Sequence, residues 1–318
     1  MADTVNAGAS SVSNTSLGAA RRAKNDEFYT QLADIERELR HYKEHFKGKT
    51  VLCNCDDPEW SNFYKYFTLN FEFLGLAGVV TTHYAPGEQS YKLEYFGKDR
   101  EVLKTDLQGD GDFRSDECLA ILQEVDVVVT NPPFSLFREY VAQLIEHQKM
   151  FLIIGNNNAI TYKEIFKFIK EDKLWLGYPF ANGNAFFSIP SDKVADYASG
   201  VYNPETGLVK FRNVAWFTNM PHEKRNQDAI LFRTYAGAEK HYPKYDNYDV
   251  IEVSKVKDIP CDYSGYMGVP ITFLDKHNPQ QFEIVGIANS ARWIGFECLT
   301  VLSGVKTYNR LIVKRIGS

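Results

Sequence analysis

The run Val125–Thr130 (VDVVVT) limits more than any other feature what this chain can fold into. Its β-branched residues follow one another without polar alternation, which is typical of a strand that is buried on both faces. Similar short apolar runs at Thr50–Cys55, Gly78–Tyr84 and Met150–Ile154 alternate with segments of helical periodicity. This pattern predicts an α/β fold with a doubly wound, mostly parallel sheet that helices cover on both faces.

Apolar residues that recur at helical spacing predict helices over Asp26–Phe46, Ser61–Phe73, Phe137–His147 and Tyr162–Lys170. After about residue 190 the pattern changes to short strands, at Val214–Thr218 and Ile230–Arg233, between loops rich in Pro, Asn and Tyr.

We therefore expect three parts in the chain. Residues 1–20 are small, polar and without periodicity, and they predict a disordered tail. The basic residues that follow also suit an organelle presequence, although a plain flexible tail is favoured. Residues 21–190 form the α/β domain, and residues 191–318 form a second region.

The composition is that of a globular protein, with 44% hydrophobic and 24% charged residues among 318. We expect no membrane span, because no uncharged apolar stretch approaches the 18 or so residues that one needs. Five cysteines, an odd number, do not predict a disulfide framework and favour a reducing, intracellular setting. This setting is the cytoplasm in a bacterium, and the nucleus or an organelle in a eukaryote.

A net charge of −5 excludes a histone-like coat of positive charge. The charge is uneven, since residues from 191 onward hold 16 Lys and Arg against 14 Asp and Glu, whereas the first 190 hold 20 against 27. If a polyanion binds, we expect it to contact the C-terminal part.

The segment Asn131-Pro132-Pro133-Phe134 directly follows the valine-rich strand. Asn-Pro also occurs in plain turns, but the carboxyl ends of strands are where open α/β sheets bind ligands. The side-chain oxygen of Asn131 and the carbonyl of Pro132 can both accept hydrogen bonds from one amino group. The ring of Phe134 can stack on a planar base. Together these residues predict a site for an exocyclic amine.

Asn-Pro-Pro-Phe resembles the catalytic motif of S-adenosylmethionine-dependent amino-methyltransferases. The chain as a whole resembles the EcoRI-type adenine-specific (N6) DNA methyltransferase family, in five further blocks between about residues 24 and 284. These blocks are Asp26–Thr30, Cys53–Pro58, Gly109–Ser115, Tyr242–Asp249 and Met267–Leu274. The resemblance implies a Rossmann-like catalytic domain, S-adenosylmethionine as cofactor, double-stranded DNA as partner, and a C-terminal target-recognition region.

The cofactor is expected at the carboxyl end of the strand Thr50–Cys55, the first strand of the sheet along the chain. A carboxylate there can bind the methionine amino group or offset the sulfonium charge. Many such enzymes have a glycine-rich loop there, but this chain and the family it resembles do not. The resemblance extends the cofactor site to an N-terminal motif and to a Gly-Asp segment near the cofactor's adenine. The residues expected to contact the cofactor are Phe28, Tyr29, Thr30, Asn54, Cys55, Asp56, Asp57, Asp110, Asp112 and Phe113, although a plain Gly-Asp turn is the alternative for the last three.

The resemblance also implies that the target adenine flips out of the duplex and stacks on Phe134. Phe187 is a candidate for the other face of the base, and the alternative is that it is a core residue of the sheet. Basic residues of the C-terminal part are candidates for phosphate contacts: Lys224, Arg225, Arg233, Lys240, Lys244, Lys255 and Lys257.

No metal is expected. His41 and His45 have the i, i+4 spacing of metal ligands but lack a partner motif, and Cys53 and Cys55 lack a second pair.

Two other enzyme classes can use the same four-residue motif: an RNA amino-methyltransferase (guanine N2 or adenine N6) and a protein glutamine methyltransferase. A nucleic-acid-binding module without activity is a third alternative, which the intact Asn131–Phe134 motif disfavours. The C-terminal blocks favour the DNA enzyme over the two other enzyme classes. A monomer is slightly favoured.

Overall fold

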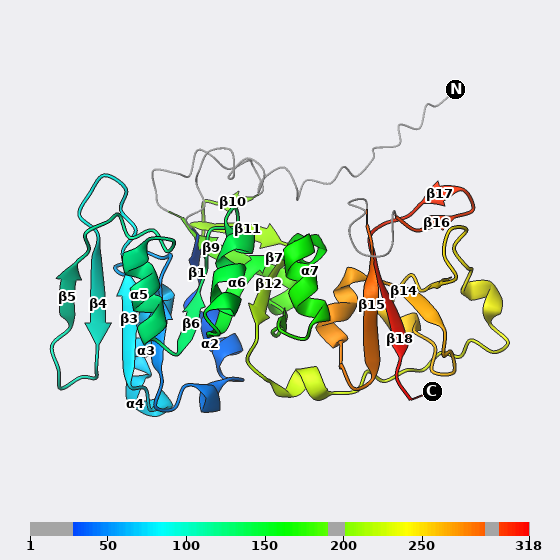
Figure 1. The fold of residues 1–318 in the computed structure, drawn as a ribbon, viewed down its shortest axis with the longest axis horizontal. Helices are drawn as coiled ribbons and strands as arrows, with labels where there is room; N and C mark the ends of the chain where they lie inside the picture. Colours follow the sequence, from blue (N-terminus) through cyan, green and yellow to red (C-terminus); the bar gives the residue numbers. More distant parts are fainter. Residues whose placement is uncertain (1–27, 190–200, 290–298, 318) are drawn as a thin grey trace, which may run out of the picture.

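The computed structural model describes residues 28–189, 201–289 and 299–317, so the expected tail at 1–20 lies outside the described residues. An eight-stranded sheet runs through the described part of the chain in the order β5-β4-β3-β2-β6-β7-β12-β8 (Figure 1). Its strands are β2 (Thr50–Cys53), β3 (Gly78–Thr82), β4 (Tyr91–Tyr95), β5 (Leu103–Asp106), β6 (Val127–Thr130), β7 (Met150–Asn156), β8 (Trp175–Leu176) and β12 (Val214–Thr218).

This sheet is mixed, which corrects the expectation of a mostly parallel one. The four central strands, β3-β2-β6-β7, are parallel, but β4 and β5 on one side and β12 and β8 on the other pair antiparallel. No helix separates β3, β4 and β5 along the chain, and strands joined by a short loop pair antiparallel. The runs that alternate with helices supply the parallel core.

Helices cover both faces of the sheet, as expected. Val51 and Val127 face a core with α2 (Leu32–Leu39), α3 (Asn62–Leu69) and α4 (Phe71–Leu74). Their neighbours Leu52 and Val128 point the other way, since successive strand residues face opposite sides. The helices on that second face are α5 (Asp116–Glu124), α6 (Phe137–Glu146) and α7 (Lys163–Lys170).

The helix expected over Asp26–Phe46 is shorter, since α2 begins at Leu32 and ends at Leu39. Tyr29 and Thr30 form a short strand, β1, which pairs antiparallel with β9 (Asn184–Ser188) and so engages the backbone that a helix would use. The helix expected over Ser61–Phe73 divides at Asn70 into α3 and α4, and the Ser61 hydroxyl caps α3. The helices expected at Phe137 and Tyr162 are confirmed to within one residue at each end.

Strand pairing crosses the boundary expected near residue 190. β9 pairs with β11 (Leu208–Arg212), which pairs in turn with β10 (Tyr202–Asn203), while β12 completes the large sheet. The strands that follow Thr218 belong to neither of these two sheets. Short 3-10 segments connect these strands and helices: η1 (Lys43–His45), η2 (Asn157–Thr161), η3 (Ala181–Gly183), η5 (Glu223–Asn226), η6 (Glu239–His241), η7 (Val256–Asp258) and η8 (Ile271–Lys276).

The C-terminal part forms its own sheet, in the order β13-β14-β18-β15, and a hairpin of β16 (Val301–Leu302) and β17 (Val305–Lys306). Its core is continuous with the α6 and α7 face of the large sheet, because Phe282 and Ile287 belong to the same buried cluster as Phe166 and Ile169. The strands are β13 (Ile251–Glu252), β14 (Tyr266–Pro270), β15 (Phe282–Ala288) and β18 (Arg310–Arg315).

The strand expected at Ile230–Arg233 is wrong. Within the described residues, this segment contributes one isolated bridge, between Arg233 and Pro260. Ile230 and Phe232 are 77% and 80% exposed, and Leu231 between them is partly buried against the core without strand pairing. Among the helices of the described ranges, none is long and apolar enough to cross a membrane.

Candidate active site

A pocket of about 470 Å³ lies at the carboxyl ends of β2, β3 and β6, a volume within the usual range for small-molecule sites. The chain runs from β2 to β3 on one side and reaches β6 on the other side of β2, so the pocket sits where the strand order reverses. The residues around it are Tyr29, Cys55, Asp56, Asp57, His83, Tyr84, Ala85, Pro86, Glu88, Gly111, Asp112, Phe113, Arg114, Pro133, Ser135 and Leu136.

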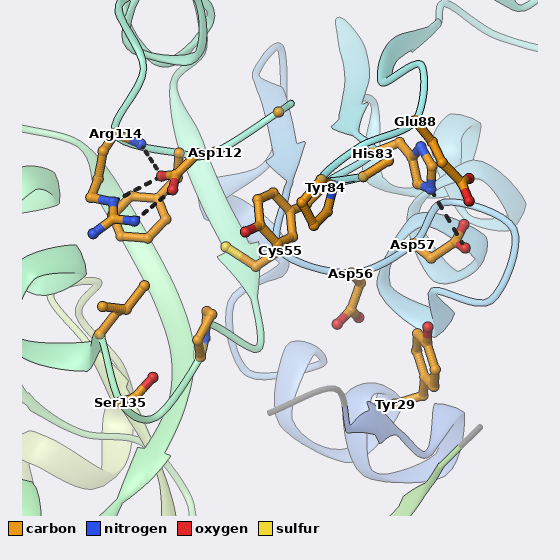
Figure 2. Close-up of a pocket in the computed structure, with 16 residues that line it drawn as sticks. Tyr29, Cys55, Asp56, Asp57, His83, Tyr84, Glu88, Asp112, Arg114 and Ser135 are labelled. Atoms are coloured by element: carbon orange, nitrogen blue, oxygen red, sulfur yellow. Dashed lines mark hydrogen bonds and ion pairs between the residues drawn. The ribbon is translucent and has the colours of Figure 1, made fainter. Parts of the chain in front are cut away.

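The loop after β2 presents two carboxylates to this pocket. Asp56 is 5% exposed and accepts a hydrogen bond from the Ser61 hydroxyl (3.2 Å). Asp57 accepts one from the backbone N–H of Glu59 (2.9 Å), and its second oxygen lies 3.9 Å from Nε2 of His83. Figure 2 shows Asp57 and His83 together at one end of the pocket. This end can bind a cationic group.

Asn54 lies behind the pocket and joins its parts. Its side-chain oxygen accepts a hydrogen bond from the Tyr140 hydroxyl of α6 (2.5 Å), and its carbonyl accepts one from the Thr130 hydroxyl at the end of β6. Cys55, the next residue, has a left-handed backbone (φ 69°). The bonds of Asn54 therefore hold the loop after β2, helix α6 and the end of β6 in one arrangement.

The segment after β5 forms the opposite end of the pocket (Figure 2). The Arg114 guanidinium donates to both carboxylate oxygens of Asp112 (2.9 and 2.6 Å) and holds the pKa of Asp112 below its usual value. Gly111 has a φ of +80°, and a Cβ there would overlap the carbonyl oxygen of His83. Asp110 lies outside the pocket lining, and its carbonyl accepts from the N–H of Ala85 (2.9 Å).

Asn131 is 4% exposed and is held in one orientation. Its Nδ2 donates to the carbonyl of Phe28 (2.7 Å), which can only accept. Its Oδ1 is buried and has no hydrogen-bond partner in the described residues. A buried acceptor without a donor costs roughly 1–3 kcal/mol, so Oδ1 is an acceptor that a ligand N–H would satisfy.

Phe134 stands on an aromatic cluster. Its ring stacks on Phe28 with centroids 6.1 Å apart and planes at 29°, and Phe28 packs in turn on Phe187 and Phe211. Phe28 is 2% exposed and Phe187 fully buried. Neither ring lines the pocket: Phe28 supports the loop after β6, and Phe187 packs in the core of its sheet.

The pocket collects the predicted residues Tyr29, Cys55, Asp56, Asp57, Asp112, Phe113 and Pro133. Thr30 and Asn54 are buried outside its lining. His83, Tyr84 and Glu88 also line the pocket but were not predicted, because the strand expected over Gly78–Tyr84 ends at Thr82. The signal was available, since residues just after any parallel strand of this sheet reach the same edge.

Two of the phosphate-contact candidates are corrected by their burial. Lys224 donates to the carbonyl of Gly177 (2.8 Å), and Arg225, 8% exposed, pairs with Asp172 over the ring of Trp175. Arg225 is therefore buried, and Lys224 is half-buried with its ammonium group bonded to the protein backbone. The other candidates are exposed: Arg233, Lys240, Lys244, Lys255 and Lys257.

The described residues contain no group of three or more His, Cys, Asp or Glu side chains that could hold a metal ion. His41 stacks on Tyr178 with centroids 3.6 Å apart, and His45 bonds the carbonyl of Pro221 (2.8 Å). These two contacts account for the His-x-x-x-His spacing as packing.

Comparison with known proteins places this site in a family. The family model for the adenine-specific methyltransferase EcoRI matches residues 16–314. The chain is 46% identical over 294 residues to the type II methyltransferase M.EcoRI of Escherichia coli, covering 87% of this chain and 90% of that one. It is 45% identical over 272 residues to M.MpnI of Mycoplasma pneumoniae (84% and 83% covered), and 42% identical over 277 residues to M.MgeORF184P of Mycoplasma genitalium (84% of each).

No solved structure matches the chain significantly. The family match spans most of the chain, including the pocket, the loop after β6 and the C-terminal sheet. The chain therefore belongs to the EcoRI-type family of adenine-specific DNA methyltransferases.

Proposed function

We propose that this protein methylates N6 of an adenine that is flipped out of double-stranded DNA, with Asn131 as the acceptor for the adenine amine. Family membership makes the chain a type II adenine-specific DNA methyltransferase that uses S-adenosylmethionine. The observation that carries the residue assignment is the buried, unpartnered Oδ1 of Asn131, one residue before the Pro132-Pro133 turn at the pocket.

We infer a Rossmann-like methyltransferase fold from the parallel core β3-β2-β6-β7, the helices on both faces and the position of the pocket at the strand-order reversal. The pocket also suits the proposed cofactor chemically. Asp56, Asp57 and Glu88 can bind the cationic amino-acid end, and the pocket lining includes the aromatic rings of Tyr29, Tyr84 and Phe113, on which a planar base could stack.

S-adenosylmethionine supplies an electrophilic methyl group on a sulfonium. Adenine N6 is a weak nucleophile, because its lone pair is delocalised into the ring. A hydrogen bond from N6–H to Oδ1 of Asn131, and a second to the Pro132 carbonyl, would favour a pyramidal nitrogen and direct its lone pair toward the methyl group. These residues act by positioning and preorganised polarity, and no base is needed before the methyl moves.

The Phe28–Phe134 stack leaves one face of Phe134 for the flipped adenine, because Phe28 supports the other. Phe28 thus acts on the base through two contacts: its carbonyl orients the Asn131 amide and its ring supports Phe134. We assign the C-terminal part, with its exposed Arg233, Lys240 and Lys244, to duplex binding and target recognition.

Long-read modification mapping of DNA from cells that express the protein tests this function. We expect N6-methyladenine within one recurring sequence, and none above background with Asn131→Ala. Unmodified DNA from cells with soluble wild-type protein would contradict the proposal, as would an equal level of methylation by the Asn131→Ala variant.

A further inference from the structure

The hairpin β16–β17 is fixed to the C-terminal sheet by the side chain of Asp246. One carboxylate oxygen accepts from the backbone N–H of Gly304 (2.7 Å), the other from that of Ser303 (3.3 Å). The N–H of Asp246 also donates to the carbonyl of Val301 (2.8 Å). Asp246 therefore binds both the tip and the base of the hairpin.

Asn247 repeats this arrangement one residue later. Its Oδ1 accepts from the N–H of Val301 (2.8 Å), and its Nδ2 donates to the carbonyl of Leu299 (3.1 Å). Asp246 and Asn247 lie in the Tyr242–Asp249 block, whose resemblance to the family the catalytic site does not explain. Their bonds give this block a physical role, which is to hold the hairpin.

The hairpin is short, with two residues in each strand, so contacts from outside it are needed to hold it in place. Ser303 and Gly304 both have positive φ (51° and 77°), which is the two-residue turn whose twist matches paired strands. A two-stranded hairpin is marginally stable by itself. Leu302 packs against a small C-terminal cluster around Tyr245 and Ile312, and the bonds from Asp246 and Asn247 fix the rest.

The side chains beyond Leu302 face solvent. Val305 is 67% exposed and Tyr308 is 82% exposed, and Lys306 between them is also exposed. Since successive strand residues point to opposite sides, both faces of β17 are open. Val305, Lys306 and Tyr308 therefore offer an apolar, a cationic and an aromatic side chain to a binding partner.

The position of the hairpin indicates its partner. In Figure 1 it extends toward the same edge of the molecule as β10 and β11. Those strands belong to the sheet of β1, whose Tyr29 lines the pocket. A duplex that lies across this edge would meet the pocket side and the hairpin together.

We propose that β16–β17 enters the major groove and reads base edges near the target adenine, an inference that rests on the proposed duplex methylation. The major groove admits a two-stranded ribbon. Val305 can contact a thymine methyl group, Lys306 can donate to guanine O6 or N7, and the Tyr308 hydroxyl can donate or accept. Asp246 and Asn247 are positioning residues, which hold the ribbon without touching DNA.

The test compares methylation of the mapped target duplex with that of duplexes in which one base pair is replaced. Tyr308→Ala and Lys306→Ala should each lower the ratio of kcat/KM for target over replaced site at least tenfold for one or more positions. S-adenosylhomocysteine affinity should stay within twofold. Asp246→Ala should lower the same ratio by releasing the hairpin.

Phe73→Ala is the matched control, because Phe73 is 65% exposed on α4, away from this edge (Figure 1). It should leave the ratio unchanged. If Tyr308→Ala and Lys306→Ala both keep the wild-type ratio within twofold, while wild type methylates the target, the hairpin proposal is overturned and the proposed function stands. If wild type methylates no DNA, both are overturned.

Discussion

The loop after β6 and the hairpin β16–β17 are both held by polar side chains that bond backbone groups, yet they differ in exposure. Asn131 is 4% exposed and uses only its Nδ2, so its Oδ1 remains buried and unpartnered. Asp246 uses both carboxylate oxygens, and the side chains near its hairpin, such as Tyr308, face solvent.

This difference follows from what each element is proposed to do. Polar groups that act on a reacting atom are most effective when they are preorganised and shielded from water. Side chains that read bases must instead reach out into a groove. In the loop after β6, the Oδ1 of Asn131 therefore lacks a hydrogen-bond donor. At the hairpin, the complete side chains of Val305 and Tyr308 are exposed to solvent.

Asn131→Ala should have the largest effect, because it removes the proposed acceptor for the adenine amine. Loss of one preorganised polar group should lower kcat by about 10²–10³, or roughly 2.7–4 kcal/mol, because the amide meets the base amine and not the cofactor. Single-turnover methyl transfer measures the rate, and calorimetry with S-adenosylhomocysteine should give wild-type affinity.

Asn247→Ala is the counterpart of this variant in the C-terminal part. It removes an asparagine that holds the hairpin, so we expect discrimination between sites to fall while kcat on the target stays within a few fold. An equal loss of kcat in both variants would contradict the division of roles.

Two buried glutamates, Glu38 in the α/β part and Glu252 in the C-terminal part, should make the stability of the fold depend on pH in opposite ways. Burial raises the pKa of Glu38 to about 7. Burial also acts to raise the pKa of Glu252, but hydrogen bonds from Arg310 and Tyr245 outweigh it and lower that pKa. Glu38 therefore destabilises the fold as pH rises from about 4.5 to 7, whereas the contribution of Glu252 is lost as pH falls below its ordinary pKa.

Glu38→Gln should remove the first of these effects. The amide oxygen can still accept from Tyr42 and from the N–H of Tyr178, so the variant should gain stability over wild type as pH rises from 5 to 8. The gain should be on the order of 2–3 kcal/mol. Urea unfolding of both proteins across this range measures it, and parallel curves would contradict the assignment.

Phe134→Ala should weaken capture of the flipped base. Base–aromatic stacking is worth roughly 1–3 kcal/mol, so KM for the target duplex should rise about 5- to 150-fold. A 2-aminopurine at the target position should give a smaller fluorescence change on binding than with wild type. An unchanged signal and KM would place the base elsewhere.

The exposed cations should affect affinity through salt. If Arg233, Lys240 and Lys244 contact phosphates, replacing each by Ala should make the slope of log K against log salt shallower by about 0.9. Lys47→Ala, on an exposed residue after η1, is the control. Filter binding between about 50 and 300 mM salt measures the slope. The Debye length changes roughly twofold over this range. An unchanged slope in the triple variant would remove these three residues from the interface.

Several parts of the fold and site could be predicted from the sequence. The periodicity of apolar residues indicates the strands, and the residues that directly follow the strands indicate the site. Val214–Thr218 is a strand with the expected bounds, and Asn131 follows β6 as its motif required. Asp56, Asp57 and Asp112 meet in one pocket because residues after the strands of one sheet reach a shared edge.

Predictions that depended on whether a side chain is exposed to solvent were less successful. Lys224 and Arg225 form a basic pair in sequence, but their side chains bond Gly177 and Asp172, about 50 residues earlier in the chain, and are partly or fully buried there. Nothing local to Phe187 distinguishes a ring that is fully buried from its neighbour Phe186, which is 38% exposed.

By itself, the amino-acid sequence determined the α/β class, the family and the residues that end the strands of the site, because periodicity and motif depend on neighbours along the chain. Only the tertiary structure decided that the Phe28 carbonyl orients Asn131 and that Asp246 holds the hairpin. These contacts join residues 103 and 58 positions apart. Such pairs depend on how sheets and loops pack, since a side chain meets a distant carbonyl or N–H only when the whole fold brings the two together.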